Sequence, residues 1–240
     1  MATIQELKLK FDKFKAEDSL FDNIFEIKKD ILSSDSIDYL EYHYELSYDE
    51  SIKEGLRNMI KSFFDSTIEN KRDKQKTAMF LFQKYQNSSS NLRKADILKI
   101  LGHLRAREAR ELALQEIKSN NYDLRYSSII VLGWTGTEKD LVILNERMLK
   151  DPEGQLRGYA ATAMRQIWYN HPKTKDAIAE YICNAAPQEK NADALTGMII
   201  TIQTLYRKKF GIKESTYGDI SGNVSEAKEK MMTFLNKTIK

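Results

Sequence analysis

A two-residue phrase, Leu-Arg, recurs at a fixed interval in the middle of the chain and constrains the fold more than any other feature. It occurs at 92–93, 124–125 and 156–157, so successive copies are 32 residues apart, and each copy opens an apolar run with helical spacing. A fixed period of this length is typical of proteins in which one helix pair stacks on copies of itself, because a single pair cannot bury its apolar face alone. The repeat therefore predicts a helical solenoid.

The composition supports helix and indicates where the protein resides. Gly (10) and Pro (3) are scarce among the 240 residues and 30% of residues are charged, which favours helices over strands and loops. The single Cys183 cannot form an internal disulfide, which favours a reducing compartment. The first residues lack the apolar core of a signal peptide, and no stretch approaches the roughly 20 apolar residues of a membrane span. We therefore expect a soluble, cytoplasmic protein without membrane contact.

Apolar residues three or four positions apart predict about 13 helices along the chain. Each repeat is expected to hold a first helix (92–104, 124–133 and 156–169) and a second helix (107–118, 138–150 and 173–185). Residues 1–85 are interpreted as divergent N-terminal helices, 90–209 as the best-matching repeats and 224–239 as a C-terminal capping helix. No shift in composition marks a domain boundary, so one continuous solenoid over residues 1–240 is expected.

One of the N-terminal helices carries an apolar face that the spacing defines closely. Phe21, Ile24, Phe25, Ile27 and Ile31 are expected to line up after the capping residues Asp18 and Ser19. The sequence therefore predicts one helix whose aligned apolar residues include both phenylalanines.

The repeat unit resembles the HEAT and HEAT-like repeat family. The resemblance rests on the Leu-Arg pair, on the alanines that follow it at 160–161, on Leu-Gly near the helix end at 101–102 and 132–133, and on Asp-Pro-Glu at 151–153. It implies an all-α fold, a right-handed α-solenoid of antiparallel helix pairs (an α-α superhelix). Such a scaffold specifies no activity by itself.

The resemblance also implies a role for the recurring arginines. In the family, an Asp in the turn between repeats and the Arg that opens the next repeat form a hydrogen-bonded ladder, and Asp151 and Arg157 match that spacing. Asn87 and Ser119 stand at the corresponding positions before Arg93 and Arg125, which leaves the ladder open there. A row of phosphate-binding arginines is the alternative interpretation.

No set of residues has the spacing of a catalytic or metal site. His43, His103 and His171 lie far apart in the sequence without a second ligand at helical or turn spacing. Cys183 has apolar neighbours, which favours packing over nucleophilic chemistry, and no Gly-rich phosphate loop is present. We therefore expect no catalytic residue, no metal and no cofactor.

An acidic, tyrosine-rich segment is the first candidate binding site. Residues 30–52 contain no Lys or Arg, and Asp38, Glu41, Glu45 and Asp49 form one stripe if a helix extends that far. Carboxylates and tyrosines together suit contact with a basic protein, although a solvated face with part of the tyrosines in the core is the alternative. The predicted partner-binding residues are Asp35, Asp38, Glu41, Tyr42, Glu45 and Asp49.

A basic segment follows and suggests a second kind of partner. Its arginines and lysines outnumber the local carboxylates and could follow a nucleic-acid backbone, although the interleaved acids also fit an ordinary solvated surface. HEAT-like DNA glycosylases line a basic surface with tryptophans, but this chain has only two. The alternative nucleic-acid contacts are Lys74, Lys76, Arg105, Arg107 and Arg110.

Three functional hypotheses follow. The first is a non-enzymatic module that binds a protein through the acidic helix or the concave face of the solenoid. In size and charge such a protein resembles bacterial immunity proteins, which mask a toxin domain, and a basic toxin would suit the acidic stripe. The second is a nucleic-acid-binding protein, including a DNA-glycosylase-like one, that uses the basic middle. The third is an assembly scaffold with several partners.

Overall fold

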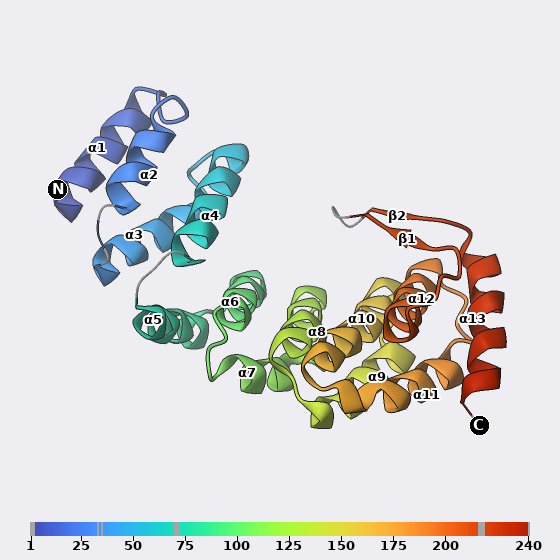
Figure 1. Ribbon diagram of the computed structural model, residues 1–240. Helices are drawn as coiled ribbons and strands as arrows, with labels where there is room; N and C mark the ends of the chain where they lie inside the picture. The colour runs from blue at the N-terminus through green and yellow to red at the C-terminus, as the bar shows by residue number, and fades with distance from the viewer. Residues whose placement is uncertain (1–2, 33, 35, 70–72, 216–218, 240) are drawn as a thin grey trace. The chain divides into compact units, whose positions relative to one another are not determined.

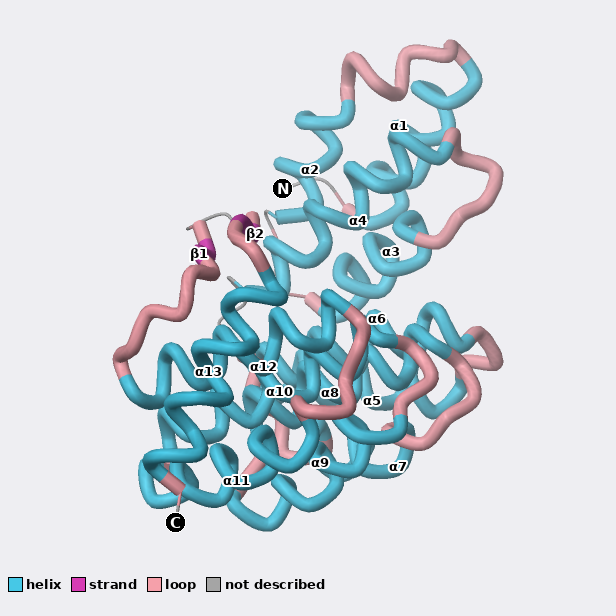
Figure 2. Tube along the Cα trace, turned by 90° about the vertical axis from the view of Figure 1, so that its right-hand side faces the viewer, coloured by secondary structure: helices cyan, strands magenta, loops and turns pink. Residues whose placement is uncertain are grey.

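In the computed structural model, residues 3–32, 34, 36–69, 73–215 and 219–239 are described (Figure 1). These residues are almost entirely helical, apart from loops and one short antiparallel hairpin of β1 (Lys213–Glu214) and β2 (Ile220–Ser221), drawn in magenta in Figure 2. The prediction of an all-α solenoid is confirmed. The described helices are α1 (Ile4–Ala16), α2 (Ile24–Leu32), α3 (Ile37–Ser47), α4 (Glu54–Glu69), α5 (Lys74–Asn87), α6 (Asn91–His103), α7 (Ala109–Glu116), α8 (Tyr122–Thr135), η1 (Glu138–Asp140), α9 (Leu141–Lys150), α10 (Gly154–Asn170), η2 (Pro172–Thr174), α11 (Lys175–Ala185), α12 (Ala192–Tyr206) and α13 (Val224–Thr238).

The chain divides into two compact units, Met1–Gln83 and Lys84–Lys240, and the division falls within α5. The first unit holds α1 to α4 and the start of α5. The second unit holds the rest of α5 and everything that follows. A single continuous solenoid over residues 1–240 stays a prediction.

The first unit is organised around one apolar cluster to which α1 to α4 all contribute. Leu7 and Phe11 of α1 are buried in it, as their spacing of four residues predicts. Ile24, Ile27 and Ile31 of α2 meet them from the neighbouring helix. Burying these side chains removes apolar surface from water, which is the main driving force for folding this unit.

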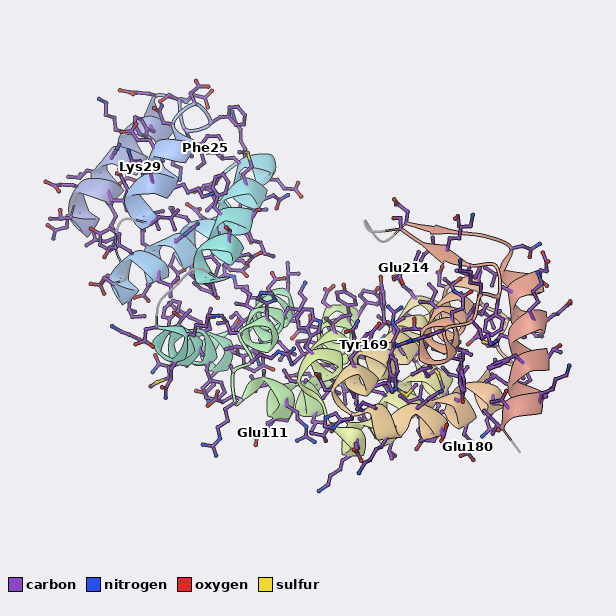
Figure 3. All side chains as sticks on the ribbon, in the orientation of Figure 1. Phe25, Lys29, Glu111, Tyr169, Glu180 and Glu214 are labelled. Carbon is purple, nitrogen blue, oxygen red and sulfur yellow. The ribbon has the colours of Figure 1, made fainter. Side chains whose placement is uncertain are left out.

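Phe21 and Phe25 do not line up with the buried isoleucines of α2 as predicted, and both residues are 65% exposed. The helix α2 begins only at Ile24, so Phe21 lies in the preceding turn rather than on the helical face. Phe25 follows Ile24 directly and therefore lies about 100° around the helix from it. Its ring contacts Phe63 of α4 at a centroid distance of 5.5 Å (Figure 3).

The second unit consists of helix pairs stacked in two layers. The first helices α6, α8, α10 and α12 lie side by side in one layer, and the second helices α7, α9 and α11 lie side by side in the other (Figure 1). The capping helix α13 packs on α11 and α12 at the end of the stack. The observed helices agree with the predicted first and second helices to within a few residues, the variation expected at helix ends.

Small residues allow the first helices to approach closely. A Cβ atom on Gly102 of α6 would lie 2.6 Å from Val131 of α8, and one on Gly197 of α12 would lie 2.3 Å from the carbonyl oxygen of Gly158 of α10. The alanines at 160–161, which follow the third Leu-Arg pair, are fully buried. The small residues of the repeat thus have the packing role that a solenoid requires.

Side-chain caps fix where several first helices begin. Ser90, Asn121 and Asn191 precede α6, α8 and α12, and each side chain accepts a hydrogen bond from a backbone N–H in the first turn. These bonds satisfy donors that have no partner within the helix.

The recurring arginines link neighbouring repeats. The Nη1 atom of Arg125 donates to the carbonyl oxygens of Ser119 and Asn120 at 3.0 and 3.1 Å, and its Nε atom donates to the Asp151 carboxylate at 2.9 Å. Arg157 repeats this pattern one unit later, with the carbonyl of Asp151 at 2.8 Å and the Glu189 carboxylate at 2.7 Å. Both arginines therefore have a structural role.

The carboxylate partner within this ladder differs from the prediction. The side chain of Asp151 pairs with Arg125 of the preceding repeat, whereas Arg157 donates to the backbone carbonyl of Asp151. The ladder also includes Arg125, for which the sequence left it open. At Ser119 the backbone carbonyl oxygen accepts the hydrogen bond from Arg125. No Asp side chain is therefore needed at that position.

Candidate protein-binding surfaces

An acidic surface covers one side of α3 in the first unit. Asp38, Glu41 and Glu45 are exposed at steps of three and four, and we call these three residues the acidic face of α3. The opposite side of the helix buries Leu40 and Tyr44 in the core. The helix is therefore amphipathic, and its packing directs the three carboxylates outward.

Two other predicted members of this site are engaged within the protein. Tyr42 is partly buried, and its ring packs edge-on against Phe11 at 6.3 Å. Burial, with smaller contributions from Asp12 and Asp49, raises the pKa of the Tyr42 phenol. The stripe of four carboxylates is thus shorter than predicted, because α3 ends at Ser47, before Asp49.

The local contacts of Asp49 explain its place in the loop. Its carboxylate accepts a hydrogen bond from the backbone N–H of Ser51 at 2.9 Å and lies 3.5 Å from Lys15 Nζ. Hydrogen bonding from the Ser51 hydroxyl is the main cause that lowers the pKa of Asp49. Asp35, the remaining predicted member, lies outside the described residues.

Two of the predicted basic residues are engaged in contacts within the protein. Arg110 makes a two-pronged contact with the buried Asp140 carboxylate, with distances of 2.8 and 2.6 Å, and this hydrogen bonding raises its pKa. Arg105 donates to the backbone carbonyl of Trp134. Arg107 is exposed in the second unit, whereas the exposed Lys74 and Lys76 belong to the first. Two of the five predicted contacts are therefore used inside the protein.

A pocket of about 310 Å³ lies on the first-helix layer of the second unit, and we call it the tyrosine pocket. The rings of Tyr122 and Tyr126 stack at 6.3 Å with an angle of 6°, and Tyr159 of α10 lies 5.3 Å from Tyr126. The Tyr122 hydroxyl donates to Gln155 Oε1 at 2.7 Å, which joins α8 to α10. The lining residues are Leu92, Ala95, Asp96, Lys99, Tyr122, Asp123, Tyr126, Ser127, Gln155 and Tyr159.

Charged and polar groups lie beside these rings. Asp96 is only 7% exposed and lines the pocket, with Lys99 Nζ 3.7 Å from its Oδ1 atom. The same Nζ atom lies 5.6 Å from the centre of the Tyr126 ring. Ser127 is fully buried, and its Oγ atom has no hydrogen-bond partner among the residues that the structure describes. The pocket thus combines aromatic faces, carboxylates and an unused hydroxyl.

A second pocket, of about 510 Å³, lies between α10, α12 and the hairpin. Arg165 of α10 forms an ion pair with Glu214 of β1 at 3.1 Å (Figure 3), and its Nη1 atom also donates to Thr204 at 3.4 Å. These contacts tie the hairpin to the first-helix layer within the second unit.

The histidines and the cysteine occupy structural surroundings. His43 is buried, with its Nε2 atom 3.0 Å from the carbonyl oxygen of Ile60, and Cys183 is partly buried near Asn236. Across the described ranges, no group of three or more His, Cys, Asp or Glu side chains is placed to hold a metal ion. The described helices are also too short or too polar to span a bilayer.

The stacked helix pairs and their exposed surfaces define a helical-repeat protein. Residues 78–165 match the family model described as HEAT repeats, so this segment, from α5 into α10, is made of HEAT repeats. No curated protein and no solved structure gave a significant match. HEAT repeats generally mediate protein–protein interactions and form scaffolds that are typically not enzymes.

The tyrosine pocket was missed by the sequence predictions. Asp96, Tyr126, Ser127 and Tyr159 each follow a Leu-Arg pair by one to three positions, in three consecutive repeats. Aligning the three copies would have placed these residues on neighbouring first helices. The position within the repeat was therefore the available signal.

Proposed function

We propose that the protein is a non-enzymatic protein-binding module that contacts a basic partner through the acidic face of α3. The exposure of three carboxylates on one side of this helix is the observation that carries the proposal. Exposed carboxylates on one side of a helix complement the lysines and arginines of a basic partner. The HEAT repeats of the same chain support binding to protein in general.

The finer proposal concerns the kind of partner. A basic toxin domain, masked in the cytoplasm in the way that bacterial immunity proteins act, would offer the lysines and arginines that the acidic face complements. Electrostatic complementarity of this kind accelerates association and selects against acidic competitors.

Reversing two of these charges should abolish partner binding. We expect the variant Glu41→Lys/Glu45→Lys to bind the basic partner about 100-fold more weakly than the parent chain does, because two attractions become repulsions. Both proteins are immobilised and measured in parallel. The measurement is the dissociation constant for the partner that the parent chain retains from host lysate.

The chain offers a matched control for this reversal. Asp176 and Glu180 are exposed acidic residues four positions apart on α11, in the other unit (Glu180 is labelled in Figure 3). The variant Asp176→Lys/Glu180→Lys makes the same charge change and should bind the partner like the parent. Equal weakening in both variants would show a general charge effect and contradict the assignment to α3.

The other two hypotheses correspond to different outcomes of these experiments. A nucleic-acid-binding protein, including a base-excising enzyme, would bind more weakly as salt rises and lose affinity in variants at the exposed Lys74, Lys76 and Arg107. An assembly scaffold would retain several proteins in comparable amounts.

A further inference from the structure

The geometry points to a second binding site: we propose that the tyrosine pocket accepts a cationic side chain, preferably arginine, from a protein partner. Lys99 occupies part of this site in the unbound protein. The inference rests on the proposed protein-binding function, but it concerns the second unit and does not require the acidic face of α3.

Aromatic rings form the walls of the site. Tyr126 lies between Tyr122 and Tyr159, at centroid distances of 6.3 and 5.3 Å. Tyrosine faces carry negative electrostatic potential and attract ammonium and guanidinium groups placed within about 6 Å of the ring centre. Burial raises the pKa of the Tyr126 phenol, with a smaller contribution from Tyr159.

The polar lining also favours a cation. Among the described lining residues, Asp96 and Asp123 supply two carboxylates and Lys99 supplies one ammonium group. A guanidinium group has donors in a fixed fork and can bond a carboxylate while its plane stacks on a ring.

The position of Lys99 indicates what kind of group the site selects. Its ammonium group lies 3.7 Å from Asp96 and 5.6 Å from the Tyr126 ring centre, so it already uses both the carboxylate and an aromatic face. Both distances are near the outer limit for such contacts. A partner's arginine can therefore displace Lys99, whose long side chain can turn toward water.

The test uses the full chain and a defined probe. The tripeptide acetyl-Gly-Arg-Gly-amide is titrated into the isotope-labelled protein and followed by NMR, alongside the same peptide with citrulline, which is nearly isosteric but uncharged. We expect saturable shifts at backbone amides around Asp96, Tyr126 and Tyr159, and at least about tenfold weaker binding of the citrulline peptide.

Two single-charge variants of α6 sharpen the test. Lys99→Met removes the internal competitor and should tighten arginine binding about threefold. Lys94→Met is the matched control, because Lys94 lies on the same helix with its Nζ atom over another tyrosine, Tyr85, at 5.3 Å. This control should bind the peptide as the parent does.

Several results would overturn the inference. The first is that the arginine peptide shows no saturable binding to the Lys99→Met variant, and the second is that the NMR shifts map away from the tyrosine pocket. The third is that both lysine variants tighten peptide binding equally. The fourth is that a DNA oligonucleotide, rather than the peptide, binds at these residues. The variant Glu41→Lys/Glu45→Lys should bind the peptide unchanged. The proposal for the tyrosine pocket and the proposal for the acidic face of α3 can therefore be disproved independently of each other.

Discussion

Replacing Asp151 by alanine should lower the free energy of unfolding of the second unit by about 3–5 kcal/mol. Asp151 is 2% exposed and Arg125 is 6% exposed, so their ion pair is withdrawn from water. Without the carboxylate, the buried guanidinium keeps only the carbonyls of Ser119 and Asn120. The backbone N–H of Glu153, 3.1 Å from Asp151 Oδ1, also loses its acceptor. Uncompensated burial of a charge explains the size of the effect.

The measurement is denaturant unfolding followed by circular dichroism, with an exposed ion pair as control. Lys118 and Glu146 also join neighbouring repeats, at 2.9 Å, but both side chains are substantially exposed. Glu146→Ala should therefore unfold close to the parent chain, because water replaces the lost contact. The double variant Arg125→Met/Asp151→Leu should recover much of the stability by removing both charges. Equal losses in Asp151→Ala and Glu146→Ala would contradict the structural ladder.

Replacing Gly197 by alanine should lower the free energy of unfolding of the second unit by about 2 kcal/mol or more. The added Cβ would lie 2.3 Å from the carbonyl oxygen and 2.7 Å from the Cα atom of Gly158, so α10 and α12 must separate. Alanine gains about 1 kcal/mol over glycine in a helix. The clash outweighs this gain because it involves backbone atoms, which cannot rotate away.

Another helical glycine provides the control for this prediction. Outside the adjacent residues and the backbone of α4 itself, no atom of the described residues lies within 4 Å of a Cβ added to Gly55 in α4. Gly55→Ala should therefore raise the free energy of unfolding by up to about 1 kcal/mol, since only the helix propensity changes. The same denaturant titrations measure both variants. A neutral or stabilising Gly197→Ala would show that the first helices are less closely packed than the structure indicates.

The repeat period was sufficient to predict the helix pairs of the second unit. The Leu-Arg phrase fixes the start of α6, α8 and α10, and scarce Gly and Pro leave few other places for breaks. The ladder partner of Arg125 could not be predicted from spacing, because its carboxylate, Asp151, comes from the next repeat. The exposure of Phe25 was not predicted, because the sequence alone does not distinguish an apolar residue next to the buried face of a helix from one within that face.

The candidate sites were predictable only in part. The acidic face of α3 retains Asp38, Glu41 and Glu45 of the predicted residues, because helical spacing alone determines that they share a side. Local turn bonds, which spacing does not reveal, withdraw Asp49 into the loop after α3. The tyrosine pocket draws on α6, α8 and α10, and each residue taken alone has the pattern of an ordinary surface side chain.

A module that acts by binding one protein should retain that partner from its own host. The most direct measurement is quantitative mass spectrometry of the proteins retained by the parent chain from its own host, with and without nuclease treatment. We expect one stoichiometric, basic protein that is still retained after nuclease treatment and that the Glu41→Lys/Glu45→Lys variant does not retain. Retained material that disappears with nuclease, or the absence of any stoichiometric protein, would contradict it.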